Sequence, residues 1–170
     1  DIGCDHGYLG IHLLKNCNAK SIIAADIHEG PLHSAMRNAE KYGVADKMTF
    51  HLSDGAKDIP KDFDALVCAG MGADTMIHIL EDAPWLRSKQ YYLVLQCQSK
   101  TPMLRRYLSD TGWHIAEETI SRDGKHYFAI MTRCDVTIED AGTVDVAAEA
   151  ALRCVEAPVT MMEAIRAGQK

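Results

Sequence analysis

The chain opens with a glycine-containing turn of the kind that joins a parallel strand to a helix. Residues 1–10 read DIGCDHGYLG, and in α/β proteins a turn in this position lies where the sheet binds nucleotide-like ligands. Gly3 and Gly7 are not spaced as in the G-x-G-x-x-G pattern of dinucleotide-binding proteins. The turn therefore predicts an α/β sheet with a ligand at this edge, and it argues against a dinucleotide.

The charge of the turn narrows the choice of ligand. A turn that cradles phosphate offers bare N–H groups at a helix N-terminus, whereas this one carries Asp1, Asp5 and the neighbouring His6. Two carboxylates would repel a pyrophosphate and attract a cationic ligand with a diol. S-adenosylmethionine combines a sulfonium, an ammonium group and a ribose. The turn therefore predicts a methyl-donor site.

After the turn, strand-like and helix-like segments alternate. Helices are expected over residues 11–16, 31–42, 74–82 and 102–109, and strands over residues 21–26, 47–52, 63–68 and 91–95. An Asp-Gly turn within residues 122–125 predicts an antiparallel hairpin between residues 113–120 and 126–132. This order predicts an α/β, Rossmann-like class I methyltransferase fold with a mostly parallel seven-stranded sheet and a C-terminal antiparallel hairpin.

The length of the chain and its change in composition after residue 133 predict one main domain followed by a tail. With 170 residues, 47% of them hydrophobic, the chain can build one sizeable core. We expect a methyltransferase domain over residues 1–133 and a divergent or truncated helical tail over residues 134–170. Because the turn stands at the very start, we expect the first strand to be truncated and the chain to be a fragment.

Composition limits the partners and the compartment. The formal net charge is −6, so a nucleic acid would have to meet a local basic patch. Lys100, Arg105 and Arg106 form one small basic face, for which a solvated helix surface is the default interpretation and a phosphate contact the alternative. No apolar run is long enough to cross a membrane. The eight histidines show no paired ligand spacing, so no metal site is expected.

The cysteines point to a reducing environment. Six cysteines are scattered along the chain without any C-x-x-C pair. This pattern favours buried thiols in a cytoplasmic protein over disulfides or a zinc site.

Acidic residues end two of the predicted strands, where an open parallel sheet binds its ligands. Asp26 comes about twenty residues after the glycine turn, a spacing typical of a side chain that holds a ribose diol. With the following Ile27 it is assigned to the cofactor, and the alternative is a surface aspartate that caps the next helix. Asp54 could accept the exocyclic amine of an adenine, or with Gly55 could merely form a tight turn.

Two further segments are candidates at the same edge of the sheet. Gly70-Met71-Gly72 follows a predicted strand, and two glycines around one side chain let the backbone approach a ligand closely. Gly70 is assigned to the cofactor, and Met71 and Gly72 to the substrate; the alternative is a turn that only requires a positive φ. Gln96, also assigned to the substrate, and Gln98 are expected after a strand, as substrate contacts or as ordinary loop residues.

Three motifs together carry a family resemblance. They are residues 1–9 (DIGCDHGYL), residues 69–72 (AGMG) followed by Ile77, Ile79 and Leu80, and the Gly124-Lys125-x-Tyr127 element. The chain resembles the bacterial tRNA (adenine(22)-N1)-methyltransferase family over residues 1–133. The resemblance implies a Rossmann-like domain, S-adenosylmethionine as methyl donor, and N1 of an adenine at position 22 of tRNA as acceptor.

The chain departs from the family pattern at two places. The family usually carries a glycine where this chain has Ala73, and Leu-Gln-Pro-Asn where this chain has Leu95-Gln96-Cys97-Gln98. The family's C-terminal extension, which is implicated in holding tRNA, is not recognisable in residues 134–170. These differences bear on how the target base is positioned and on how the RNA is held.

The chemistry of the implied reaction suggests roles for the opening turn. Adenine N1 already carries a lone pair, so the enzyme has to capture an unstacked adenine and align it with the methyl group. Asp5 is expected to stabilise the charge that develops on the ring or to accept the N6 proton, while His6 and Tyr8 shape the pocket. Asp1 and Gly3 are expected to serve the donor. As an alternative, Asp5 only caps the first helix.

Two other functions stay open at this point. One is methylation of a different RNA or of a small molecule, and the other is a non-catalytic module that binds the cofactor or RNA.

Overall fold

The computed structural model describes residues 1–88, 91–123 and 126–132. The chain divides into two compact units, the first formed by Asp1–Lys61 and the second beginning at Asp62. The predicted tail at residues 134–170 lies outside the described residues, and so does the hairpin turn at residues 124–125.

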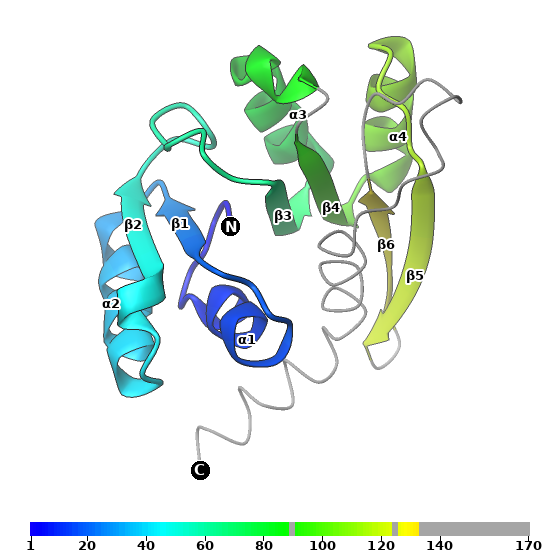
Figure 1. The fold of residues 1–170 in the computed structure, drawn as a ribbon. Helices are drawn as coiled ribbons and strands as arrows, with labels where there is room; N and C mark the ends of the chain where they lie inside the picture. Colours follow the sequence, from blue (N-terminus) through cyan, green and yellow to red (C-terminus); the bar gives the residue numbers. More distant parts are fainter. Residues whose placement is uncertain (89–90, 124–125, 133–170) are drawn as a thin grey trace. The chain divides into compact units, whose positions relative to one another are not determined.

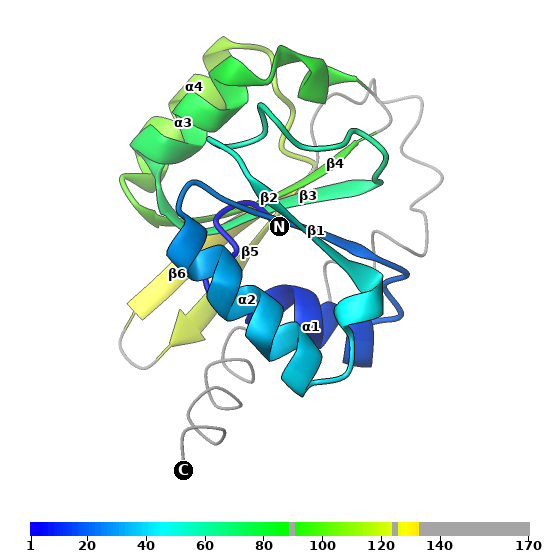
Figure 2. The same ribbon diagram turned by 90° about the vertical axis from the view of Figure 1, so that its left-hand side faces the viewer.

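The first unit is a parallel strand pair covered by two helices (Figures 1 and 2). Its elements are α1 (Tyr8–Asn16), β1 (Ile22–Asp26), α2 (Glu29–Lys41), η1 (Ala45–Lys47) and β2 (Met48–Leu52). β1 and β2 pair in parallel from Ile22–Met48 to Asp26–Leu52. Ile2 forms a parallel bridge with Ala25, so the opening residues run alongside β1. The carboxyl ends of the strands and the opening turn therefore share one edge.

The core of the first unit follows the helical periodicity of α2. Leu32, Ala35 and Ala39 recur on one side of this helix and are buried together with Ile11 of α1 and Ala24 of β1. Small residues at Ala35 and Ala39 let α2 pack closely on its neighbours. Figure 2 shows α1 and α2 side by side.

The second unit is a four-stranded mixed sheet with helices packed on it. It contains β3 (Ala65–Gly72), α3 (Ala73–Asp82), η2 (Pro84–Arg87), β4 (Tyr92–Ser99), α4 (Thr101–Asp110), β5 (Glu117–Asp123) and β6 (His126–Thr132). The strand order is β3-β4-β6-β5, with β3 and β4 parallel and the β5–β6 hairpin antiparallel (Figure 1). The helices α3 and α4 contact each other and the β3–β4 pair.

The predicted alternation of strands and helices is confirmed, and so is the antiparallel hairpin. The described residues contain one two-stranded and one four-stranded sheet, so the expected total of seven strands stays a prediction. The hairpin begins at Glu117, not at residue 113. The reason is that Trp113 is buried beneath Arg87, whose guanidinium carbon lies 4.5 Å from the centre of the indole ring. Trp113 packs before the strand starts.

Two predicted boundaries are wrong. The expected strands ended at residues 68 and 95, but β3 continues through Gly72 and β4 through Ser99. The register shifts between Ala69 and Met71, and again between Met71 and Gly72. These irregularities bend β3 locally while its pairing with β4 continues. Gly70-Met71-Gly72 and Gln96 therefore lie within strands and not in the loops after them.

The cysteine expectation is correct in part. Cys4, Cys68 and Cys97 are free and buried, but Cys17 is disulfide-bonded, so the expectation that no cysteine forms a disulfide is wrong. Cys17 lies partly exposed at the C-terminal end of α1. In the described part of the chain, no helix has the length and apolar character needed to cross a membrane.

The β3–β4 core gives a stability prediction. Leu93 is fully buried in β4 opposite Leu66, so Leu93→Ala should lower the free energy of unfolding by about 2–5 kcal/mol through lost contacts and a cavity. Met103 is 39% exposed on α4, and Met103→Ala should change it by no more than about 0.5 kcal/mol. Urea unfolding followed by circular dichroism measures both. Equal effects of the two substitutions would contradict this core.

Candidate functional site

The opening turn has an unusual backbone. Gly3, Asp5 and Gly7 have φ angles of 69°, 48° and 72°, all in the left-handed region. Gly7 is the N-cap of α1, and no side chain caps this helix. The alternative in which Asp5 caps the first helix is therefore wrong, because a glycine in the left-handed conformation already starts the helix. Aspartate tolerates this region better than most residues, so the turn can carry a carboxylate at position 5.

Asp26 ties this turn to the end of β1. Its Oδ2 accepts the backbone N–H of Asp5 at 3.2 Å, and its Oδ1 accepts that of His28 at 3.0 Å. The residue is only 9% exposed, so it is not a surface aspartate, but its bond to His28, the N-cap of α2, bears out the part of the alternative in which it contacts the start of the next helix. An ionised carboxylate offers about four acceptor positions. The N–H groups of Asp5 and His28 occupy two of them.

The side chains next to Asp26 on the turn are open to solvent. The side chains of Asp5 and His6 are 71% and 54% exposed, and Asp5 Oδ1 lies 3.7 Å from His6 Nε2. The rings of His6 and Tyr8 have their centres 5.9 Å apart. The backbone carbonyl of His6 accepts a hydrogen bond of 2.9 Å from Asn38 Nδ2, which anchors the turn to α2. The structure thus brings together the three residues predicted to act on the acceptor.

Apolar side chains lie exposed at the carboxyl ends of both strands of the first unit. Ile27 is 55% exposed and Leu52 is 52% exposed, and the strand register pairs Leu52 with Asp26, the neighbour of Ile27. Ile27 was predicted as a cofactor contact, whereas Leu52 was not predicted as a site residue. The sequence feature that could have indicated Leu52 is its position as an apolar residue at the very end of a strand, immediately before Ser53.

Asp54 and Gly55 form an ordered turn after β2. The Ser53 hydroxyl donates to the Gly55 carbonyl at 2.9 Å and accepts the Asp58 N–H at 3.1 Å. Asp54 pairs with Lys57, with 2.6 Å between Oδ2 and Nζ. The predicted tight turn is therefore present, and the Asp54 carboxylate already has a cationic partner. Ser53, which is buried, is a structural residue that sequence reasoning missed.

In the second unit, Gly70 and Gln96 meet across β3 and β4. Gly70 has a φ of 78° and donates its N–H to Gln96 Oε1 at 2.8 Å. Gln96 is only 8% exposed, whereas Gly70 is exposed and Met71 partly so. Gly70 has the positive φ that the alternative required, but it lies within β3 and not in a turn, and Gly72 has a φ of −78° as the N-cap of α3.

The predicted basic face is largely paired with carboxylates. Lys100 Nζ lies 2.8 Å from Asp74 Oδ2, and Arg105 bonds Glu118 through its Nε at 3.0 Å. The hydrogen bond from Lys100 lowers the pKa of Asp74, and the bond to Glu118 raises the pKa of Arg105. The default interpretation, a solvated helix surface, therefore describes Lys100 and Arg105 better than a phosphate site.

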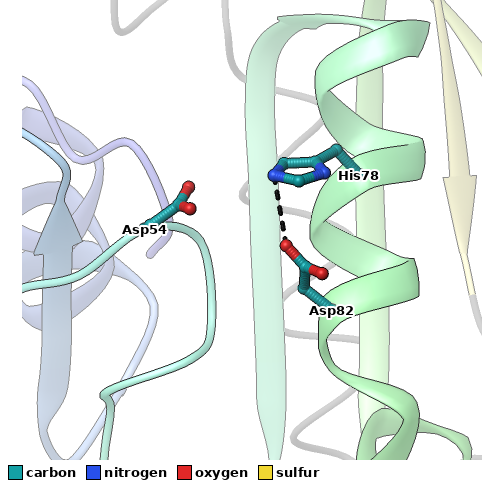
Figure 3. A group of neighbouring side chains, drawn as sticks. All are labelled: Asp54, His78 and Asp82. Atoms are coloured by element: carbon teal, nitrogen blue, oxygen red, sulfur yellow. Dashed lines mark ion pairs between the residues drawn. The ribbon is translucent and has the colours of Figure 1, made fainter.

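A histidine–aspartate pair on α3 was not predicted. His78 Nε2 lies 3.1 Å from Asp82 Oδ2, one helical turn away (Figure 3). The i, i+4 spacing is the signal in the sequence.

Cys4 is not a nucleophile at neutral pH. Burial, reinforced by the negative charge of Asp26, raises the pKa of the Cys4 thiol to about 11. Because the thiolate is the reactive form, the turn cannot use Cys4 for covalent catalysis near pH 7.

Comparisons with known proteins agree with this geometry. A family model described as "Methyltransferase domain" matches residues 1–131. The tRNA (adenine(22)-N(1))-methyltransferase of Bacillus subtilis is 34% identical over 86% of this chain and 60% of its own length. The crystal structure of the B. subtilis M1A22 tRNA methyltransferase TrmK matches with a TM-score of 0.71 and 29% identity, covering 83% of this chain and 60% of that chain.

A structure with a bound cofactor product matches as well. The structure of M. capricolum TrmK in complex with S-adenosyl-homocysteine has a TM-score of 0.68 and 27% identity, covering 79% of this chain and 60% of that chain. The predicted Rossmann-like fold and the predicted resemblance are confirmed by these matches. The chain spans about 60% of the length of the curated relatives that it matches.

The turn yields a prediction with a matched control. Gly7 and Gly43 both have positive φ, but a Cβ on Gly7 would lie 2.9 Å from Ala35 Cβ, whereas one on Gly43 would meet nothing within 4 Å. Alanine should cost roughly 1–2 kcal/mol for the backbone at either position, and Gly7→Ala should cost distinctly more because α2 has to shift. Urea unfolding of both variants tests this. A cost at Gly43 equal to or above that at Gly7 would contradict the close packing.

Proposed function

Since the chain belongs to the methyltransferase-domain family, we propose that it transfers a methyl group from S-adenosylmethionine to N1 of adenine 22 in tRNA. The observation that carries this proposal is the opening turn, where the buried Asp26 carboxylate fixes the backbone of Asp5 beside the exposed His6. The same reaction is named for the Bacillus subtilis relative. The corresponding partner is tRNA, and the proposed location is the cytoplasm of a bacterium.

For the donor side we assign residues by their position around β1 and β2. The carboxylate of Asp26 suits the hydroxyl groups of a ribose, and the exposed Ile27 suits the face of an adenine. Asp1, Gly3, Asp54 and Gly55 complete this assignment in the first unit, as predicted from the sequence. Gly70 of β3 stays a proposed cofactor residue on the strength of the sequence alone. When bound, S-adenosylmethionine supplies an electrophilic methyl group on a sulfonium.

For the acceptor side the chain has to hold a base and offset a charge. Adenine N1 needs no general base, so alignment of N1 with the methyl group accounts for much of the reduction in the activation barrier of methyl transfer. Asp5 is the exposed carboxylate of the turn and can stabilise positive charge that moves onto the ring. His6 and Tyr8 offer aromatic surface beside it. Met71, Gly72 and Gln96 stay proposed substrate residues on the strength of the sequence alone.

We also propose that residues 1–133 form the methyltransferase domain and residues 134–170 a tail. A second candidate function is methylation of a different RNA or of a small molecule. One observation favours it: Lys100 and Arg105, two cations of the predicted basic face, are paired with carboxylates and offer less to a phosphate backbone.

A labelling experiment tests the proposal. Purified protein is incubated with methyl-labelled S-adenosylmethionine and unmodified tRNA, and the product nucleoside is mapped by mass spectrometry. We expect 1-methyladenosine at position 22 and no label in a transcript with guanine at that position. Label in a small molecule, in another RNA, or nowhere would contradict the proposal.

The role of Asp5 can be tested in the same assay. Asp5→Asn keeps the shape and tolerates the left-handed backbone but removes the charge, so the turnover number should fall by about 100-fold or more. The affinity for S-adenosylhomocysteine should change little. Asp110→Asn, at an exposed position on α4, serves as the control and should have no effect. Unchanged turnover in Asp5→Asn would remove Asp5 from the mechanism.

A further inference from the structure

The amide of Gln96 has a fixed orientation. Its Oε1 accepts the N–H of Gly70 at 2.8 Å, and a backbone N–H can pair only with the oxygen of the amide. The two atoms of the group are therefore distinguished by chemistry, and Nε2 is directed away from this bond as a hydrogen-bond donor. The residue is 92% buried, since its exposed fraction is 8%.

The Nε2 group of this amide makes no hydrogen bond within the residues that the structure describes. The atom is also buried. Buried donors are almost always paired, so an unpaired one that is oriented by its neighbour calls for an acceptor from outside. Leaving it unpaired costs free energy in the free protein, and a ligand that supplies an acceptor regains it.

The surroundings of Gln96 allow a ligand to approach. Gly70 is exposed, and a Cβ added there would meet only Gln98 Nε2, at 3.8 Å. The strand register pairs Gln96 with Ala69 and pairs Met71 with the next residue, Cys97. Because Nε2 itself is covered, a ligand can reach it only after a neighbouring group moves.

We propose that Gln96 Nε2 donates a hydrogen bond to a ring nitrogen of the captured adenine other than N1, and thereby selects the edge of the base that it binds. This inference rests on the proposed function. N1 has to keep its lone pair for the methyl group, and the exocyclic amine is itself a donor. The acceptor is therefore N3 or N7, and a base turned to present its amine would be rejected.

Two substitutions separate the donor from the rest of the side chain. Gln96→Met keeps the size but removes the amide, and Gln96→Glu keeps an oxygen for Gly70 but loses the donor when ionised. Both should lower kcat/KM for tRNA by roughly 10- to 100-fold at neutral pH. For Gln96→Glu, which keeps the oxygen that Gly70 bonds, the dissociation constant for S-adenosylhomocysteine should change by less than about threefold. Asn16→Met, an exposed amide replacement on α1, is the control.

The pH dependence distinguishes hydrogen bonding from packing. Burial raises the pKa of an introduced carboxyl, and its protonated form regains an O–H donor. Activity of Gln96→Glu relative to wild type should therefore recover as the pH falls, while Gln96→Met should show no recovery. A merely structural role for Gln96 predicts that the free energy of unfolding of Gln96→Glu recovers in parallel with its activity, because protonation removes a buried charge. The proposal predicts that kcat/KM for tRNA recovers more than the stability does.

Atomic substitution in the RNA tests the proposal without changing the protein. Wild-type protein should lose about 10- to 100-fold in kcat/KM on tRNA carrying either 7-deazaadenosine or 3-deazaadenosine at the target. On that same RNA, Gln96→Met should lose nothing further. The inference is overturned if wild-type protein keeps full activity on both analogues. It is also overturned if Gln96→Met loses further activity on both analogues, so that the effects of the protein change and the RNA change multiply. If wild type does not methylate natural tRNA at all, the proposed function fails first; if it does and the analogues have no effect, only this inference fails.

Discussion

The first unit depends on one buried carboxylate that bonds two backbone segments. Asp26 accepts the N–H of Asp5 from the opening turn and that of His28 from the start of α2. Its own carbonyl accepts the N–H of Ser53 after β2 at 2.9 Å. Hydrogen bonds to an ionised group are stronger than neutral ones, so a single residue holds together the three segments that surround the ligand edge. If the charge of Asp26 is removed, the hydrogen bond that holds the backbone of Asp5 in its left-handed conformation becomes weaker.

The proposed division of the acidic turn between a methyl donor and an acceptor rests on a difference in burial. The Asp26 carboxylate is buried and bonded, which fixes its position, whereas Asp5 is exposed and its side chain can reach a second ligand. In the second unit, Gln96 fixes the backbone at Gly70 in a comparable way. In both units a buried polar side chain orients an exposed stretch of backbone, which is how a protein keeps a site in place before the ligand arrives.

Much of the fold could be predicted because its signals are local. The helical spacing of Leu32, Ala35 and Ala39 predicted α2, and an Asp-Gly turn predicted the hairpin. The irregular register at Gly70 could not be predicted, because a bulge depends on pairing with β4 and leaves no periodic trace. Nor could the disulfide of Cys17, since the spacing of cysteines alone does not reveal how they are connected. At the site, residue types indicated the ligand edge, but not which carboxylate is buried.

Calorimetry with S-adenosylhomocysteine tests the central claim most directly, namely that Asp26 builds the donor site. Wild-type protein should bind, and Asp26→Asn should bind at least about tenfold more weakly, because the substituted amide cannot accept both backbone N–H groups and the ribose hydroxyls. Asp46→Asn, at an exposed position in η1, should bind like wild type. Absence of binding to wild type, or equal binding by Asp26→Asn, would contradict the claim.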